Sequence, residues 1–150
     1  MLVISVILLS FSFRLFTLET LYFENPVGRL YYHPEGYVRL AWLPDRLPLA
    51  AIQAFYEQVL ALLLRTRSHL ILSDHGQRAP LPTEAQSWLT TNWIPRVMAQ
   101  AQARHCAIVE GANPIHRLST QSIVSAAPVN FTFKRFDSVA DAAAWLLSVK

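Results

Sequence analysis

The sequence is poor in charged residues and in cysteine, and both shortages limit what the protein can be. Charged residues make up 15% of the 150-residue chain, whereas soluble domains usually contain about 25%. This composition indicates either an apolar surface area that a second copy or a partner protein covers, or an average that the hydrophobic N-terminus shifts. The single cysteine, Cys106, excludes an internal disulfide. Because it lies in an apolar run, it is expected to be a buried structural thiol in a reducing, cytoplasmic environment.

Glycine is also scarce, and the four glycines are isolated in turns rather than gathered in one loop. A Gly-rich loop is what dinucleotide-binding and P-loop nucleotide sites need, so the sequence argues against both kinds of site. The chain also lacks the G-x-S-x-G, C-x-x-C and H-E-x-x-H patterns of hydrolases, thiol redox enzymes and zinc proteases. These shortages predict a non-enzymatic protein that uses no cofactor.

Basic residues are scattered along the chain, although its formal net charge is +3. Nucleic-acid-binding proteins usually gather Lys and Arg on one face or in one run, so we expect no nucleic acid partner. The five histidines stand at positions 33, 69, 75, 105 and 116, and none is spaced from another as ligands on one helix would be. A zinc or iron centre needs three or four converging ligands, so no metal site is predicted.

Residues 1–16 form a hydrophobic N-terminal extension, MLVISVILLSFSFRLF. It has the length of a signal-peptide core, but no Lys or Arg precedes it and no small-x-small cleavage site follows. It is also shorter than the ~20 apolar residues of a membrane-spanning helix. We expect a start codon assigned too far upstream or an extension that packs on a neighbouring surface, and membrane insertion is unlikely. Residues 17–150 are expected to form one domain.

Hydrophobic periodicity predicts an α/β domain with a single mixed sheet and helices packed on it. Apolar runs predict strands at residues 20–24, 29–33, 37–43, 69–73, 106–110 and 131–136. Apolar residues at three- and four-residue intervals predict helices at residues 49–65, 83–98, 115–126 and 139–149. Short turns early in the chain favour an antiparallel hairpin, and the later strand–helix alternation favours parallel strands. Pro95 is expected to bend the second helix near Thr91 and Asn92.

The strongest local candidate for a functional site is Asp74 with His75, directly after a central strand. Ligands of open α/β sheets bind beyond the carboxyl ends of such strands, and an acid beside a histidine can serve proton transfer. Adjacent residues of an extended chain point to opposite sides, however, so Ser73, Asp74 and His75 are not expected to form a nucleophile relay. Asp74 could instead brace the loop that follows. Arg96 is a further charged residue that a pocket here could include.

Residues 21–147 resemble the SpoIIAA-like, STAS-type small domains of bacterial proteins. The segments that carry the resemblance are YVRLAWL at 37–43, HLILSD at 69–74, TEAQSWLTTNWIP at 83–95, CAIVE at 106–110 and DSVADAAAWLL at 137–147. The resemblance implies a mixed sheet covered by helices and a regulatory role through protein–protein contact. In that family, anti-sigma factor antagonists are switched by phosphorylation of a Ser or Thr where a helix starts after a central strand.

Thr83 is the hydroxyl residue at that position, and the resemblance therefore implies that it is the candidate for phosphorylation. A phosphate there would meet the favourable N-terminus of a helix, but also the carboxylate of Glu84. The Asp-Ser-Ser-Gly signature of the family is absent from this chain.

The resemblance and the missing motifs together predict a non-enzymatic regulatory or protein-interaction module in signalling. Its partner would be another protein or a second copy of this chain, and a homodimer would form through the N-terminal segment or the edge of the hairpin. The alternative is a small-ligand-binding protein or minor enzyme with a pocket near Asp74, His75 and Arg96. A weaker alternative is peripheral membrane attachment through residues 1–16.

Overall fold

The computed structural model describes residues 19–150, so the predicted N-terminal extension lies outside the described residues. Within them the sequence folds into an α/β structure with one six-stranded mixed sheet, as the periodicity predicts. The strands are β1 (Thr20–Asn25), β2 (Gly28–His33), β3 (Tyr37–Trp42), β4 (Leu70–Asp74), β5 (His105–Val109) and β6 (Thr132–Phe136). In the described part of the chain, no helix has the length and apolar character needed to cross a lipid bilayer.

The order of the strands across the sheet is the same as their order along the chain, β1 to β6. β1, β2 and β3 are antiparallel neighbours, and β3 to β6 are parallel neighbours. At the β2–β3 turn the stacked rings of His33 and Tyr37 lie 4.4 Å apart. Gly36 in this turn has a φ of 103°, a backbone conformation that residues with a Cβ rarely adopt.

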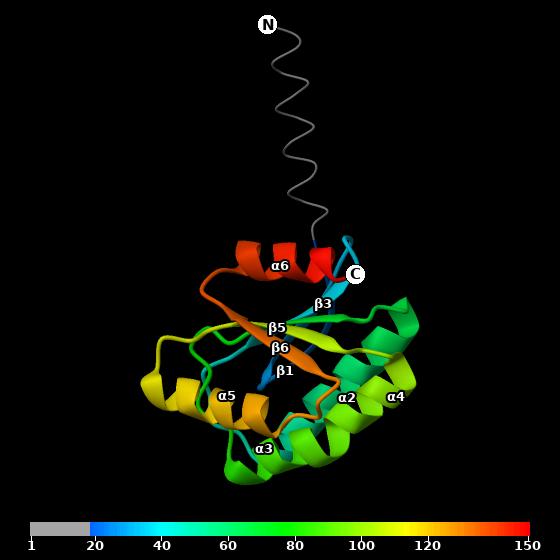
Figure 1. Ribbon diagram of the computed structural model, residues 1–150. Helices are drawn as coiled ribbons and strands as arrows, with labels where there is room; N and C mark the ends of the chain where they lie inside the picture. Colours follow the sequence, from blue (N-terminus) through cyan, green and yellow to red (C-terminus); the bar gives the residue numbers. More distant parts are fainter. Residues whose placement is uncertain (1–18) are drawn as a thin grey trace, which may run out of the picture.

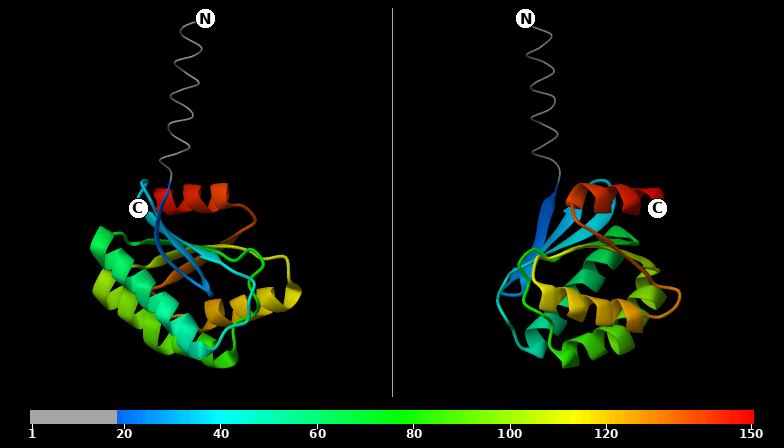
Figure 2. Two further views of the ribbon diagram at one scale, coloured as in Figure 1. Left: turned by 180° about the vertical axis from the view of Figure 1, so that it is seen from behind. Right: turned by 60° about the vertical axis from the view of Figure 1, so that its left-hand side comes forward.

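Helices cover both faces of the sheet, but unequally (Figures 1 and 2). One face carries α2 (Leu49–Thr66), α5 (Pro114–Ala126), and the continuous stretch α3 (Thr83–Trp88), η1 (Leu89–Trp93) and α4 (Ile94–Ala101). The other face carries α6 (Val139–Ser148). The three parallel crossovers therefore lie on the same face and advance in the same direction, which gives them one common handedness.

Side chains at the helix ends and Pro95 account for the local helix geometry. The Asn113 side chain accepts hydrogen bonds from the first turn of α5, and the Ser138 side chain caps α6 by accepting a hydrogen bond from the Asp141 N–H. The second predicted helix contains a π-helical turn at Leu89–Trp93. Pro95 has no N–H to donate to the carbonyl of Thr91. The wider, π-helical turn therefore lies at the position where the sequence predicts that Pro95 alters the helix.

The larger core lies between the sheet and α2, with Phe55 at its centre. Phe55 is fully buried, and its ring lies 5.2 Å from that of Trp42 and 6.4 Å from that of Phe23. Gly28 allows this packing, because a Cβ there would lie 3.2 Å from the Phe55 ring and 2.6 Å from the Ala41 carbonyl oxygen. The aromatic residues of the hairpin and of α2 thus join β1–β3 to the parallel half of the sheet.

Replacing Phe55 with Ala is expected to lower the free energy of unfolding by about 3–5 kcal/mol, because the core cannot collapse around so large a void. Urea denaturation followed by circular dichroism measures the change. Leu64→Ala on the same helix is the matched control. Leu64 is 47% exposed, so its replacement should cost about 0.5 kcal/mol or less. Equal losses from the two variants would contradict this description of the core.

Candidate functional site

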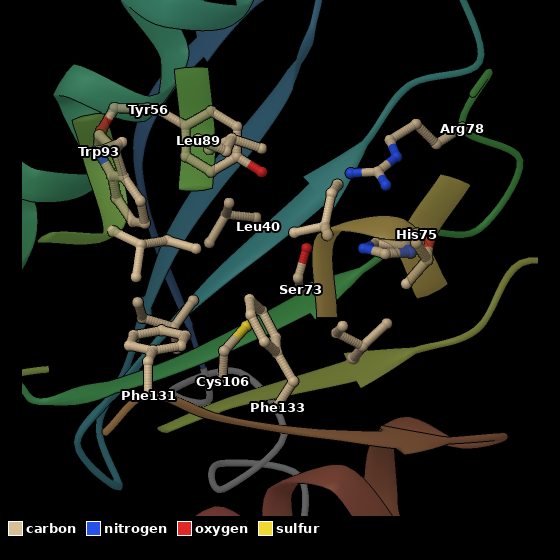
Figure 3. Close-up of a pocket in the computed structure, with 15 residues that line it drawn as sticks. Leu40, Tyr56, Ser73, His75, Arg78, Leu89, Trp93, Cys106, Phe131 and Phe133 are labelled. Atoms are coloured by element: carbon tan, nitrogen blue, oxygen red, sulfur yellow. The ribbon is translucent and has the colours of Figure 1, made fainter. Parts of the chain in front are cut away.

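A cavity of about 40 Å³ lies between the sheet and the helices α2, η1–α4 and α5. Its two ends differ in chemistry (Figure 3). One end is apolar, with Trp93 and Phe131 among its walls, and the other end holds His75 and Arg78 beside Ser73. The polar end lies at the carboxyl ends of β4 and β5, the edge at which open α/β sheets bind ligands.

The alternation of β4 decides which side chains reach the cavity. Ser73 and His75 line it, while Asp74 lies on the opposite face of the sheet, where its Oδ2 is 3.4 Å from Nη1 of Arg39. Arg39 also binds Glu19, with 2.6 Å between Nε and Oε1. The predicted alternation of these three residues is therefore confirmed. The Asp74 side chain contacts Arg39 on a neighbouring strand. The sequence predicted that it could brace the loop after β4 instead.

Arg78 enters the protein interior from the loop after β4. Gly76 has a φ of 52°, and the chain reverses so that the Arg78 N–H donates to the His75 carbonyl at 2.8 Å. The Arg78 side chain is 5% exposed. Its Nε–H donates to Nε2 of His116 at 2.9 Å, and its guanidinium carbon lies 4.5 Å from the centroid of the Trp42 ring, a cation–π distance.

No carboxylate within residues 19–150 forms a salt bridge with this buried guanidinium. Burial lowers the pKa of Arg78 to about 10, opposed chiefly by the Tyr56 hydroxyl, so the side chain stays charged at neutral pH. Glu110 is the acid that acts on it, but Glu110 is bound by Arg135 and lies 3.3 Å from Nε of Arg117. Glu110 is thus already engaged by two more exposed guanidinium groups, which leaves the buried charge of Arg78 without a counter-charge of its own.

Two buried histidines stand beside Arg78, their rings edge to face at 4.7 Å between centroids. His75 is 3% exposed and His116 is fully buried. Because Nε2 of His116 accepts the Arg78 hydrogen bond, a neutral His116 must carry its proton on Nδ1. Nδ1 of both rings is buried and without a hydrogen-bond partner among the described residues. Burying a polar atom without a hydrogen-bond partner costs free energy of folding, and such an atom often marks the place of a ligand or a water molecule.

Gly111 lets α5 approach the loop after β4 closely enough to form this cluster. A Cβ at Gly111 would lie 2.8 Å from the Gly76 carbonyl oxygen and 3.1 Å from Nδ1 of His116. The hydrogen bond between Arg78 and His116 therefore depends on a backbone contact that any larger residue at position 111 would push apart.

The hydroxyl and thiol groups in the cavity are not arranged as activated nucleophiles. Burial raises the pKa of Cys106 to about 12, so the thiolate that would attack a substrate is not formed at neutral pH. Ser73 Oγ accepts a hydrogen bond from Trp42 Nε1 at 2.9 Å. Within the described chain, neither His75 nor His116 hydrogen-bonds to Ser73 or Cys106. The arrangement suits binding of a ligand rather than covalent catalysis.

Of the four residues suggested by the sequence, His75 lines this cavity and the other three lie elsewhere. Asp74 is on the opposite face of the sheet. Arg96 on α4 forms a salt bridge with Glu57 on α2 and does not line the cavity. Thr83 is exposed at the start of α3. The structure therefore does not bring Asp74, His75 and Arg96 together in one pocket.

Sequence reasoning missed Arg78 and His116 as members of the site. Arg78 stands among polar and turn-forming residues, which is the usual setting of a surface arginine. A signal for His116 exists on α5, where His116, Thr120 and Ile123 are spaced along one helix face and are all buried. The more apolar Ile115 and Leu118 are instead 67% and 71% exposed. A helix that turns polar residues inward indicates a polar site beneath it.

The buried histidines are expected to make the stability of the protein depend on pH. Burial, aided by the charge of Arg78, lowers the pKa of His116 to about 4, and the pKa of His75 also lies well below its usual value. The unfolded chain takes up protons below about pH 6.5 and the folded chain does not, so stability is complete above pH 6.5 and is lost as the pH falls toward 4. The expected loss from His116 between pH 7 and pH 5 is on the order of 2 kcal/mol.

Urea denaturation at pH 7 and pH 5 measures this loss. His116→Gln should make the free energy of unfolding less dependent on pH, whereas His69→Gln, a change at an exposed histidine, should leave the dependence as it is. An unchanged pH dependence in His116→Gln would show that His116 is not its source.

Comparison of the chain with protein-family models, with curated proteins and with solved structures finds no match. The chemistry of the site is therefore argued from its own residues, and the STAS-type resemblance stays a prediction.

Proposed function

We propose that this protein is a small-ligand-binding module whose ligand occupies the cavity beside Arg78 and carries a negative charge. This is the alternative that the sequence left beside the regulatory module, with the pocket centred on His75 and Arg78 instead of Asp74 and Arg96. The proposal does not exclude a signalling role, because ligand binding is a common way to control a regulatory module.

The buried guanidinium of Arg78 is the observation that carries the proposal. A cation removed from water is costly unless a charge or well-placed acceptors compensate it. The hydrogen bond to His116 and the contact with Trp42 occupy Nε and one face of the group. They do not neutralise its charge, and the two Nη groups adjoin a cavity that is large enough for a small molecule. An anion in the cavity would supply the missing compensation.

Binding without reaction is the form of the function that the site supports best. The groups that face the cavity can hold an anion, since Arg78 and a neutral histidine are hydrogen-bond donors. General acid–base or nucleophilic chemistry would need a base within hydrogen-bond reach of a nucleophile. Ser73 is instead engaged with Trp42, and Cys106 is held as a thiol by burial.

Small anions should raise the thermal unfolding temperature of the wild-type chain in a saturable manner at constant ionic strength. At a ligand concentration ten times Kd, the gain in stability is about 1.4 kcal/mol. Arg78→Met keeps most of the side-chain volume but removes the charge, so the saturable gain should disappear. Arg104→Met, a change at an exposed arginine, is the control for general salt effects and should behave as wild type.

Differential scanning calorimetry over a series of sodium salts provides this measurement. An equal response of the wild-type and Arg78→Met proteins to every anion would overturn the proposed function.

A further inference from the structure

The size of the cavity limits the ligand to a few non-hydrogen atoms. A buried water molecule needs about 10–15 Å³ of such space, so 40 Å³ corresponds to about three or four water molecules. An aromatic ring is too large, because a cavity that holds benzene measures about 150 Å³. Since protein cores are packed at nearly crystalline density, the side chains that line the cavity do not move apart easily to admit a larger ligand.

The walls away from Arg78 require the rest of the ligand to be apolar. They consist mainly of aliphatic and aromatic side chains that offer no hydrogen bond, among them Leu89, Ile94, Ile123 and Phe131. A polar group placed against them would lose its hydration without replacement. The ligand must therefore have one charged end and a short hydrocarbon end.

The free edge of the guanidinium selects the kind of charged group. Nε of Arg78 is bound to His116, so a ligand would meet the edge formed by Nη1 and Nη2, which it would share with the Tyr56 hydroxyl that acts on the guanidinium. Two parallel N–H groups match the two oxygens of a carboxylate. A phosphate or sulfate dianion would bring a second charge that no further cation in the cavity lining balances.

We infer that the ligand is an aliphatic monocarboxylate of about two carbons, acetate in the simplest case, with its carboxylate on the Nη1–Nη2 edge of Arg78. This inference rests on the proposed function and specifies its ligand. The unpartnered, buried Nδ1 of His75 lies at the same end of the cavity, and the neutral imidazole provides one N–H that can donate to a carboxylate oxygen. The methyl group points toward Phe131 and Trp93.

Isothermal titration calorimetry of the full chain tests the inference with a homologous series. The sodium salts are formate, acetate, propionate, butyrate and hexanoate, with phosphate as the dianion and acetamide and propionamide as neutral molecules of the same shape. The strongest binding is expected with acetate, the two-carbon acid, and the amides should bind at least about tenfold more weakly because they lack the charge. Arg78→Met should weaken the best acid roughly 10- to 100-fold.

A cavity-filling variant tests the position of the hydrocarbon chain. Cys106 lies in the middle of the cavity lining, and Cys106→Leu adds two non-hydrogen atoms there. It should abolish binding of the acids while the unliganded protein keeps its urea midpoint. Cys106→Val, which is smaller, serves if the leucine variant does not fold, and it should reduce affinity most for the longest acid that wild type binds.

The outcomes separate the two proposals. Binding that peaks at two carbons and is lost in Arg78→Met supports both. Equal or better binding of phosphate, butyrate or hexanoate, still dependent on Arg78, overturns the two-carbon monocarboxylate and leaves the anion-binding function standing. Heats and stabilities that are the same in wild type and Arg78→Met for every compound overturn both.

Discussion

The arrangement of the whole polar end of the cavity depends on the hydrogen bond from Arg78 Nε to His116 Nε2. This bond holds a guanidinium inside the protein without a carboxylate, fixes the tautomer of a buried imidazole and joins the loop after β4 to α5. Glycine at position 111 permits it, and the ring of Trp42 stabilises the cation from β3. Three parts of the chain that are distant in sequence therefore meet at one charge.

The two faces of the sheet differ in what they enclose. The face with α2 to α5 contains both the larger core and the cavity, while the α6 face is packed around Leu72, Ala107 and Leu146. Asp74 lies on the α6 side of the sheet, where Arg39 compensates it. Asp74 and Arg78 are close in sequence but lie on opposite faces of the sheet. The nearest carboxylate along the chain therefore does not compensate the charge of Arg78.

Strand and helix positions could be predicted from the sequence because they depend on local periodicity. The strand–helix alternation after residue 37, the cap at Ser138 and the disturbance before Pro95 are all encoded within a few residues of where they occur. The side to which Ser73, Asp74 and His75 point could be predicted for the same reason. His116, by contrast, is 38 residues from Arg78, and no local pattern pairs a loop arginine with a helical histidine. The apolar residues Ile115 and Leu118 lie on the exposed face of α5, so hydrophobicity alone would not place His116 inside.

The sequential order of the strands has a consequence for how the cavity is completed. Ser73, His75 and Arg78 belong to the fourth strand and its loop, but Ile123, Phe131 and Phe133, which close the apolar end, come from the last third of the chain. A chain that has emerged only as far as β5 already contains the cation but not its cover. The hydrogen bond that holds the Arg78 guanidinium in the interior has its acceptor on α5, so it forms only after that helix has packed on the sheet.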